Sequence, residues 1–102
     1  MRIIKQVTVQ GWRRSFPKAA AGLAHWLEVI RAARWKNFVE LRKAFASADL
    51  VAVKSGRKVI VFNVCKNDFR LIAAVHFDAG KVFALRFFTH AEYDKDHWKN
   101  EL

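Results

Sequence analysis

The chain of 102 residues carries nineteen lysines and arginines against nine acids, which gives it a net charge of +10. Hydrophobic residues make up 53% of it, so it can bury a core and is not a disordered basic tail. This length fits one domain, and we expect a single domain over residues 1–102. The charge favours a polyanionic partner such as a nucleic acid, although structural proteins can also be basic.

The composition also excludes several classes of protein. The single cysteine, Cys65, excludes a disulfide framework and a cysteine-based zinc cluster, and it is typical of a reducing compartment. The four histidines show no metal-ligand spacing, and no glycine-rich phosphate loop is present, so we expect neither a metal nor another cofactor. No apolar run approaches the ~20 residues of a membrane span, and no signal peptide is recognisable. We therefore expect a cytoplasmic protein without a membrane partner.

The positive charge is concentrated in the first part of the chain. Residues 1–58 hold thirteen lysines and arginines and three acids, whereas residues 59–102 hold six of each. The excess ends in a basic loop, where we expect Lys54, Arg57 and Lys58 to contact a nucleic-acid backbone without regard to its sequence.

The N-terminal segment predicts one strand followed by helices. β-Branched residues predict a short strand over residues 2–7, and Thr8 is placed to cap a short helix that ends near Pro17. A longer helix is predicted over residues 18–35. Its four apolar positions fall at i, i+3, i+4 and i+7 on one face: Leu23, Trp26, Leu27 and Ile30.

Two capping boxes, each a cap residue followed three positions later by glutamate, mark the starts of further helices. The box at Asn37 predicts a helix over residues 37–45. The box at Thr89 predicts a helix over residues 90–99. Between these helices, three runs of β-forming residues cover residues 58–64, 69–77 and 81–88, and short turns separate them. The turns predict two hairpins and an antiparallel meander.

The hairpins assign each strand residue to a face, because opposed residues share a face. If Val64 pairs with Phe69 and Phe77 with Lys81, one face is wholly apolar and forms the bed for the helices. It comprises Ile60, Phe62, Val64, Phe69, Leu71, Ala73, Val75, Phe77, Phe83, Leu85 and Phe87. The other face carries Asn63, Arg70, His76, Arg86 and Phe88. A slip of one residue in either hairpin would exchange the faces of one strand.

Two groups of polar residues in this region are candidates for chemistry. Arg70 and Arg86 form an anion-binding floor on the second face, or else are ordinary residues of a solvated sheet. His90, Tyr93 and Asp94 share one helical face, where the histidine can take a proton from a ribose hydroxyl. The tyrosine can donate a hydrogen bond to phosphate or stack on a base. The same spacing also fits a plain surface helix with one buried ring, so both interpretations stay open.

The order of several motifs resembles the HigB branch of the RelE-like toxins over nearly the whole chain. The resemblance is carried by Trp26, Trp35, Leu41, Phe45-Ala46-Ser47-Ala48-Asp49, Val61-Phe62-Asn63, Phe69-Arg70-Leu71, Arg86 and Thr89-His90-Ala91-Glu92-Tyr93-Asp94-Lys95. It implies an α+β fold, with N-terminal helices packed on one face of a small antiparallel-rich sheet and a short C-terminal helix.

The resemblance also implies a function in a type II toxin–antitoxin system. Such toxins are endoribonucleases, or mRNA interferases, that cut mRNA typically in the ribosomal A site and inhibit translation. They use no metal: the 2′-hydroxyl attacks the adjacent phosphate and leaves a 2′,3′-cyclic phosphate. The implied partners are mRNA, the ribosome and a HigA-type antitoxin with a helix-turn-helix domain.

The family's site residues carry over onto five positions of this sequence. Arg70 of the Phe69-Arg70-Leu71 motif is implied to clamp phosphate, and His90 and Tyr93 to act as acid–base and substrate-orienting groups. Asn63 and Arg86 are implied to be polar residues of the RNA site.

Three departures from the family pattern affect the turn that precedes this motif. Cys65 and Lys66 stand where relatives often have glycine, Asp68 is acidic where they are basic or polar, and Phe69 replaces a tyrosine. Lys66 is either an RNA contact or a solvated turn residue. A non-catalytic RNA- or ribosome-binding module, or an interaction subunit for an acidic protein, remains an alternative to the nuclease.

Overall fold

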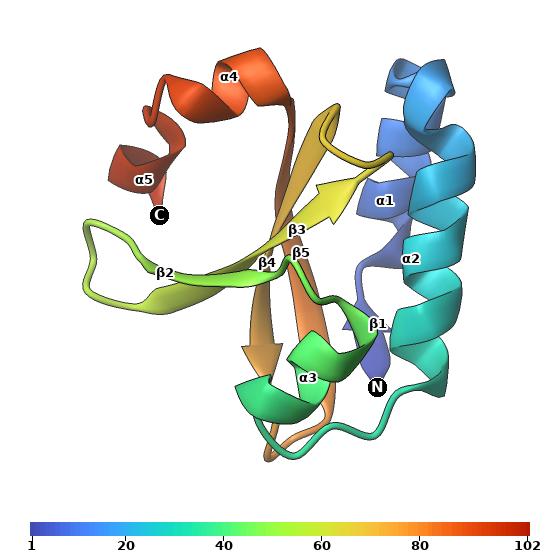
Figure 1. Cartoon of the computed structure of the whole chain (residues 1–102), viewed down its shortest axis with the longest axis vertical. Coiled ribbons are helices and arrows are strands. Elements are labelled where there is room, and N and C mark those ends of the chain that lie inside the picture. The colour runs from blue at the N-terminus through green and yellow to red at the C-terminus, as the bar shows by residue number, and fades with distance from the viewer.

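Five strands form one mixed sheet in the computed structural model, which describes all of residues 1–102 (Figure 1). The strands are β1 (Arg2–Ile4), β2 (Asp49–Ala52), β3 (Lys58–Val64), β4 (Phe69–His76) and β5 (Lys81–Thr89). Their order across the sheet is β1-β5-β4-β3-β2, and only β1 beside β5 is a parallel pair. The helices are α1 (Gln6–Ser15), α2 (Ala20–Ala32), α3 (Phe38–Ala44), α4 (His90–Asp94) and α5 (Trp98–Glu101). The predicted α+β class is confirmed.

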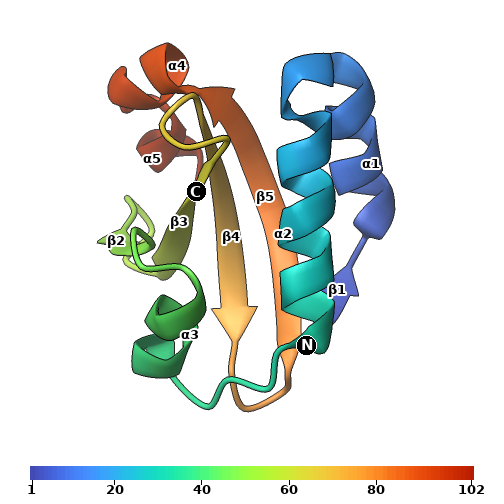
Figure 2. The same ribbon diagram turned by 45° about the vertical axis from the view of Figure 1, so that its right-hand side comes forward.

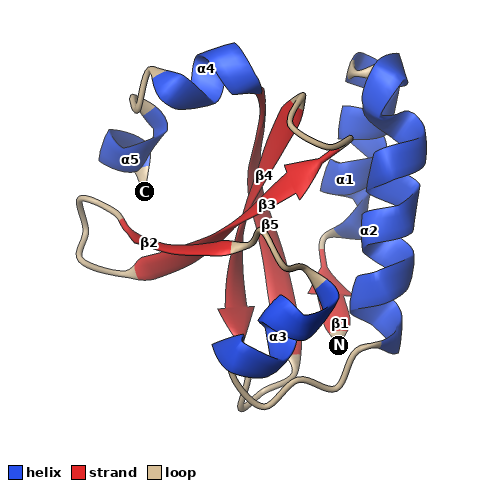
Figure 3. Cartoon of the chain, viewed as in Figure 1, coloured by secondary structure: helices blue, strands red, loops and turns tan.

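The main core lies between one face of the sheet and the N-terminal helices, as Figures 2 and 3 show. The predicted apolar stripe of α2 is buried there, and α3 adds Leu41 to the same cluster. Both predicted cap residues are confirmed: the Asn37 side chain accepts from the backbone N–H of Glu40, and the Thr89 hydroxyl accepts from that of Glu92. The glutamates do not complete the boxes, since Glu40 accepts from the backbone N–H of Lys36 and Glu92 from the Lys95 amine. The helix starts were therefore readable from local sequence.

The N-terminal prediction was wrong in its boundaries. The strand ends at Ile4 rather than at residue 7, because Lys5 adopts a left-handed conformation with φ of 58° and starts α1. Thr8 lies inside the first turn of that helix and does not cap it. The helix predicted over residues 18–35 is shorter, since α2 begins after a 3₁₀ turn at Pro17–Ala19.

Both predicted hairpins exist, and the first has the predicted register, with Val64 opposite Phe69. In the second, Lys81 pairs with His76 rather than with Phe77, and a β-bulge beside Ile72 and Ala73 restores the predicted pairs near the end of β5. In the half of β5 before the bulge, each side chain therefore lies on the opposite face of the sheet from the predicted one. Consequently Val82 and Ala84, not Phe83 and Leu85, contact the main core.

The opposite face is not an open solvated surface, because the C-terminal segment folds over part of it (Figure 2). The helix predicted over residues 90–99 is broken at Asp96, where φ is 61°, and α5 then places Trp98 on the sheet. Trp98 is only 2% exposed and packs against a second apolar cluster that includes Val59 and Ile72. The short edge strand β2 at Asp49–Ala52, which pairs with β3, was not predicted either. No helix of the chain is long and apolar enough to span a membrane.

Candidate active site

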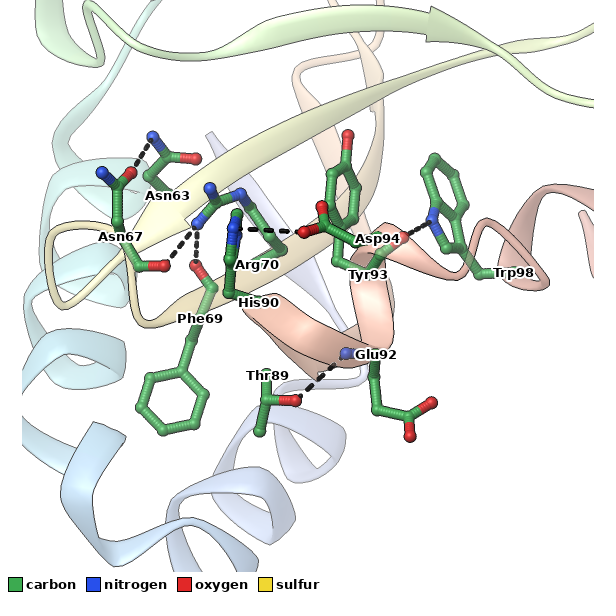
Figure 4. A network of polar contacts seen from close by, with 10 residues as sticks. All are labelled: Asn63, Asn67, Phe69, Arg70, Thr89, His90, Glu92, Tyr93, Asp94 and Trp98. Carbon is green, nitrogen blue, oxygen red and sulfur yellow. Dashed lines mark hydrogen bonds and ion pairs between the residues drawn. The ribbon is translucent and has the colours of Figure 1, made fainter.

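The three predicted catalytic residues, Arg70, His90 and Tyr93, lie where the start of β4, the end of β5 and the first turn of α4 meet (Figure 4). The backbone pairing of β4 with β3 places Arg70 opposite Asn63, and the pairing with β5 places it opposite Phe88. The backbone N–H of His90 donates to the carbonyl of Asp68 over 2.9 Å, which ties α4 to the β3–β4 turn. Three separate segments thus deliver their polar side chains to one end of the sheet.

Arg70 is the only charged residue among the buried ones and is 8% exposed. Its Nη1 donates to the carbonyls of Asn67 and Phe69, over 3.0 and 3.1 Å. Its Nε and Nη2 make no hydrogen bond to the protein, and no carboxylate lies within ion-pair distance of the guanidinium. Neither nitrogen is among the buried polar atoms that lack a partner, so this edge of the guanidinium remains accessible to solvent.

Tyr93 lies between Arg70 and Trp98 (Figure 4). The guanidinium carbon of Arg70 is 5.5 Å from the centre of the phenol ring, and the Trp98 ring stacks on Tyr93 at 5.4 Å. The Trp98 indole N–H also donates to the Tyr93 carbonyl over 3.2 Å. These contacts fix the ring orientation, and the cation–π contact helps to hold the guanidinium in place.

Burial raises the pKa of the Tyr93 hydroxyl above its ordinary value of 10.0. The carboxylate of Asp49 raises this pKa further, Asp94 and Asp96 add to the effect, and Arg70 opposes it. The hydroxyl keeps its proton at neutral pH and can donate a hydrogen bond.

His90 is the first residue of α4, and its side chain is half exposed. Its Nε2 lies 3.2 Å from Oδ2 of Asp94, one helical turn further on. A carboxylate in this position orients the ring and leaves Nδ1 without a protein partner. The i, i+4 spacing read from the sequence therefore produces a real contact between the two side chains.

The remaining predicted residues do not all join this cluster. The Asn63 amide donates weakly to the side chain of Asn67, over 3.5 Å, and Lys66 is exposed on the turn beside it. Arg86 instead faces α5, where its Nε lies 3.4 Å from Glu101. Lys54 and Arg57 are exposed in the β2–β3 loop, and the exposed Lys58 begins β3. The backbone N–H of Lys54 donates to the carbonyl of Lys99 in α5 over 3.0 Å.

Sequence reasoning missed three residues that shape the site. Asn67 supplies the carbonyl that holds Arg70, Trp98 supports Tyr93, and Asp49 raises its pKa. Trp98 follows Tyr93 by five positions, a spacing that does not share one helical face, so no periodic signal pointed to it. Asn67 lies four residues from Asn63 across a short turn, which was the one local signal for their contact.

The left-handed residues of the β3–β4 turn account for one departure from the family pattern. Cys65 and Lys66 have φ angles of 53° and 61°, a conformation that glycine adopts without strain. Two residues with side chains thus form this turn. The resulting conformation still delivers Asn67 to Arg70.

The chain is similar to known proteins over most of its length. A family model described as the RelE-like toxic component of a toxin–antitoxin system, HigB_toxin, matches residues 19–96. The mRNA interferase HigB of Escherichia coli O6:H1 (strain CFT073) is 32% identical over 95 residues, which cover 93% of this chain and 90% of the relative. The mRNA interferase toxin HigB of Escherichia coli K12 and the mRNA interferase HigB of Shigella flexneri are each 30% identical over 94 residues, covering 92% of this chain and 88% of each relative. The chain belongs to the HigB family of RelE-like toxins.

Proposed function

We propose that this HigB-family toxin is an endoribonuclease that cleaves mRNA and thereby inhibits translation. The observation that carries the proposal is the buried Arg70, whose Nε and Nη2 edge is free while its Nη1 is anchored by two backbone carbonyls. Such an edge matches two oxygens of a phosphate with parallel hydrogen bonds. The relatives named mRNA interferase support RNA as the source of that phosphate.

The proposed reaction is an attack by the ribose 2′-hydroxyl on the adjacent phosphorus. His90 removes the proton of the 2′-hydroxyl, the new bond from O2′ to phosphorus forms, and the bond from phosphorus to O5′ breaks. Tyr93 gives its proton to the departing O5′, and Arg70 balances the charge that builds up on the phosphate oxygens. The products are a 2′,3′-cyclic phosphate and a 5′-hydroxyl end.

The toxin–antitoxin family implies an antitoxin partner and an RNA target. We extend the proposal to a HigA-type antitoxin with a helix-turn-helix domain, to cleavage in the A site of the ribosome, and to action in the cytoplasm. The net charge of +10 supports the ribosomal step, because a strongly basic protein associates rapidly with RNA.

Primer extension on mRNA after induced expression in a bacterium tests the proposal. Cleavage within codons is expected for the unaltered chain, and fragments with a 5′-hydroxyl end are expected. Arg70→Lys keeps the charge but lacks the fork of donors, so it should lose about 10²–10³-fold in cleavage. His90→Ala and Tyr93→Phe should also reduce cleavage. The control Arg14→Ala, at an exposed residue of α1, should not.

Two results would contradict this function in different ways. Full cleavage by Arg70→Ala and by His90→Ala would show that the active site lies elsewhere. Arrested growth with intact mRNA would instead support a non-catalytic module that binds RNA or the ribosome.

A further inference from the structure

The largest cleft of the protein, with a volume of about 630 Å³, lies at the opposite end of β4 and β5 from Arg70. It is formed by the start of β1, the end of α2, the segment that leads to α3 and the β4–β5 turn, which meet near the N-terminus in Figure 1. The backbone N–H of Arg2 donates to the carbonyl of Gly80 over 2.8 Å and joins two of these segments. The cleft shares no residue with the candidate active site.

Four cationic side chains line this cleft, and a single carboxylate accompanies them. The cations are Arg2, Arg31, Arg34 and Lys36, and the acid is Asp78. All four cations are exposed and none forms an ion pair, since every ion pair of the protein lies within residues 86–101. Arg31 and Arg34 hydrogen-bond only to neutral groups, the side chain of Gln6 and the carbonyl of Ala33. The cleft therefore carries an excess of positive charge, which is reduced in part by Asp78 in its lining and by Glu40, whose carboxylate accepts from the backbone N–H of Lys36 over 2.9 Å.

The end of α2 would ordinarily weaken such a site, because the free carbonyls of a helix C-terminus repel anions. Here the Met1 amine covers them, donating to the carbonyls of Ile30, Arg31 and Ala33 over 2.8, 3.3 and 2.6 Å. Burial lowers the pKa of this amine, and Arg34 lowers it further. The protonated amine has three N–H groups, one for each of these carbonyls.

We propose that this basic cleft, lined by Arg2, Arg31, Arg34 and Lys36, binds backbone phosphates of RNA at a distance from the cleaved bond. Trp35 also lines the cleft and is half buried, so its ring offers an apolar wall beside the cations for a neighbouring base. The inference rests on the proposed function only for the choice of RNA as the polyanion. The cleft binds without regard to sequence, because phosphate contacts carry no base information.

The test measures binding of a fluorescent oligouridylate to the full chain by anisotropy at several salt concentrations. The cleft variant is Arg31→Gln with Arg34→Gln. The control variant is Arg42→Gln with Lys43→Gln, which removes the same charge from exposed α3 residues outside the cleft. Loss of two phosphate contacts should lower the slope of log Kd against log salt by about 1.4, with little change for the control. Amide chemical shifts of Lys36 and Gly80 should move on titration with the oligouridylate.

The outcomes separate this inference from the nuclease function. Equal slopes of log Kd against log salt for the cleft and control variants would contradict RNA binding in the cleft, even if Arg70→Lys abolishes cleavage. The expected lower slope for the cleft variant, together with uncleaved mRNA, would support RNA binding in the cleft and contradict the nuclease function. Unchanged RNA binding by the cleft variant together with weakened binding of polyglutamate would assign the cleft to an acidic polypeptide and overturn RNA as its ligand.

Discussion

Tyr93 is the only tyrosine of the chain, so the ionisation of its hydroxyl can be followed without interference. Its ring is held between the Arg70 guanidinium and the Trp98 indole, and the carboxylates around it favour the neutral phenol. Neighbours from β2, β4 and α5 therefore set the pKa and the orientation of Tyr93.

At the residue scale, we predict that the Tyr93 hydroxyl titrates above pH 10.0 in the folded protein. Because folding raises this pKa, the Tyr93 hydroxyl contributes to the free energy of unfolding. The contribution is fully present below pH 10.0 and is lost as pH rises through the folded-state pKa. Asp49→Asn should lower this pKa, since it removes a negative charge near the phenol. The measurement is phenolate absorbance against pH. The matched control Asp78→Asn, at the far end of the sheet, should leave the titration unchanged, and equal shifts in both variants would contradict the role of Asp49.

At the scale of elements, α2 packs closely against the β3–β4 turn, which contributes to the candidate site. A Cβ atom added at Gly22 would lie 2.7 Å from Sγ of Cys65 and 2.9 Å from Cγ1 of Val64. The absence of a side chain on this helix therefore lets it approach the β3–β4 turn, which supplies Asn67 to Arg70. In α1, by contrast, a Cβ at Gly11 meets nothing closer than 4.0 Å.

We predict opposite effects for the same substitution in these two helices. Gly11→Ala should raise the free energy of unfolding by up to about 1 kcal/mol, because alanine favours the helix. Gly22→Ala should lower it, since overpacking costs about 1–3 kcal/mol and outweighs that gain. Urea denaturation of both variants makes the comparison. Cys65→Ala combined with Gly22→Ala should recover part of the lost stability. If Gly22→Ala stabilises the protein as Gly11→Ala does, α2 is not closely packed against the turn.

On the scale of the whole molecule, charge is divided between two regions. The four ion pairs all lie in the C-terminal segment, whereas the excess cations of residues 1–58 have no ion-pair partner. Like charges on a molecule whose longest extent is 31 Å repel one another and oppose folding.

We therefore predict that salt stabilises this protein. Raising the ionic strength from about 0.01 to about 0.15 M shortens the Debye length from about 30 to about 8 Å and screens the repulsion. The melting temperature should rise over this range, and a short RNA at low salt should raise it further by binding the native state. Thermal unfolding followed by circular dichroism measures both effects. A melting temperature that falls with salt would mean that the ion pairs outweigh the repulsion.

Local sequence was enough for the elements whose causes lie within a few residues. The caps at Asn37 and Thr89 and the buried stripe of α2 depend on contacts between positions three or four apart. The first hairpin has its predicted register because a short turn fixes which residues face each other. That register places Arg70 opposite Asn63, so the core of the site was readable before the fold was known.

Tertiary structure alone decided the features that join distant segments. The bulge in β5 moved Leu85 to the opposite face, and the left-handed Asp96 turned Trp98 back onto the sheet. Arg70 is buried against Tyr93 rather than exposed on a solvated sheet. Composition by itself determined that the chain is basic and able to fold. Which charged side chain is buried, and which ring it contacts, depends on packing between residues far apart in sequence, which no local pattern encodes.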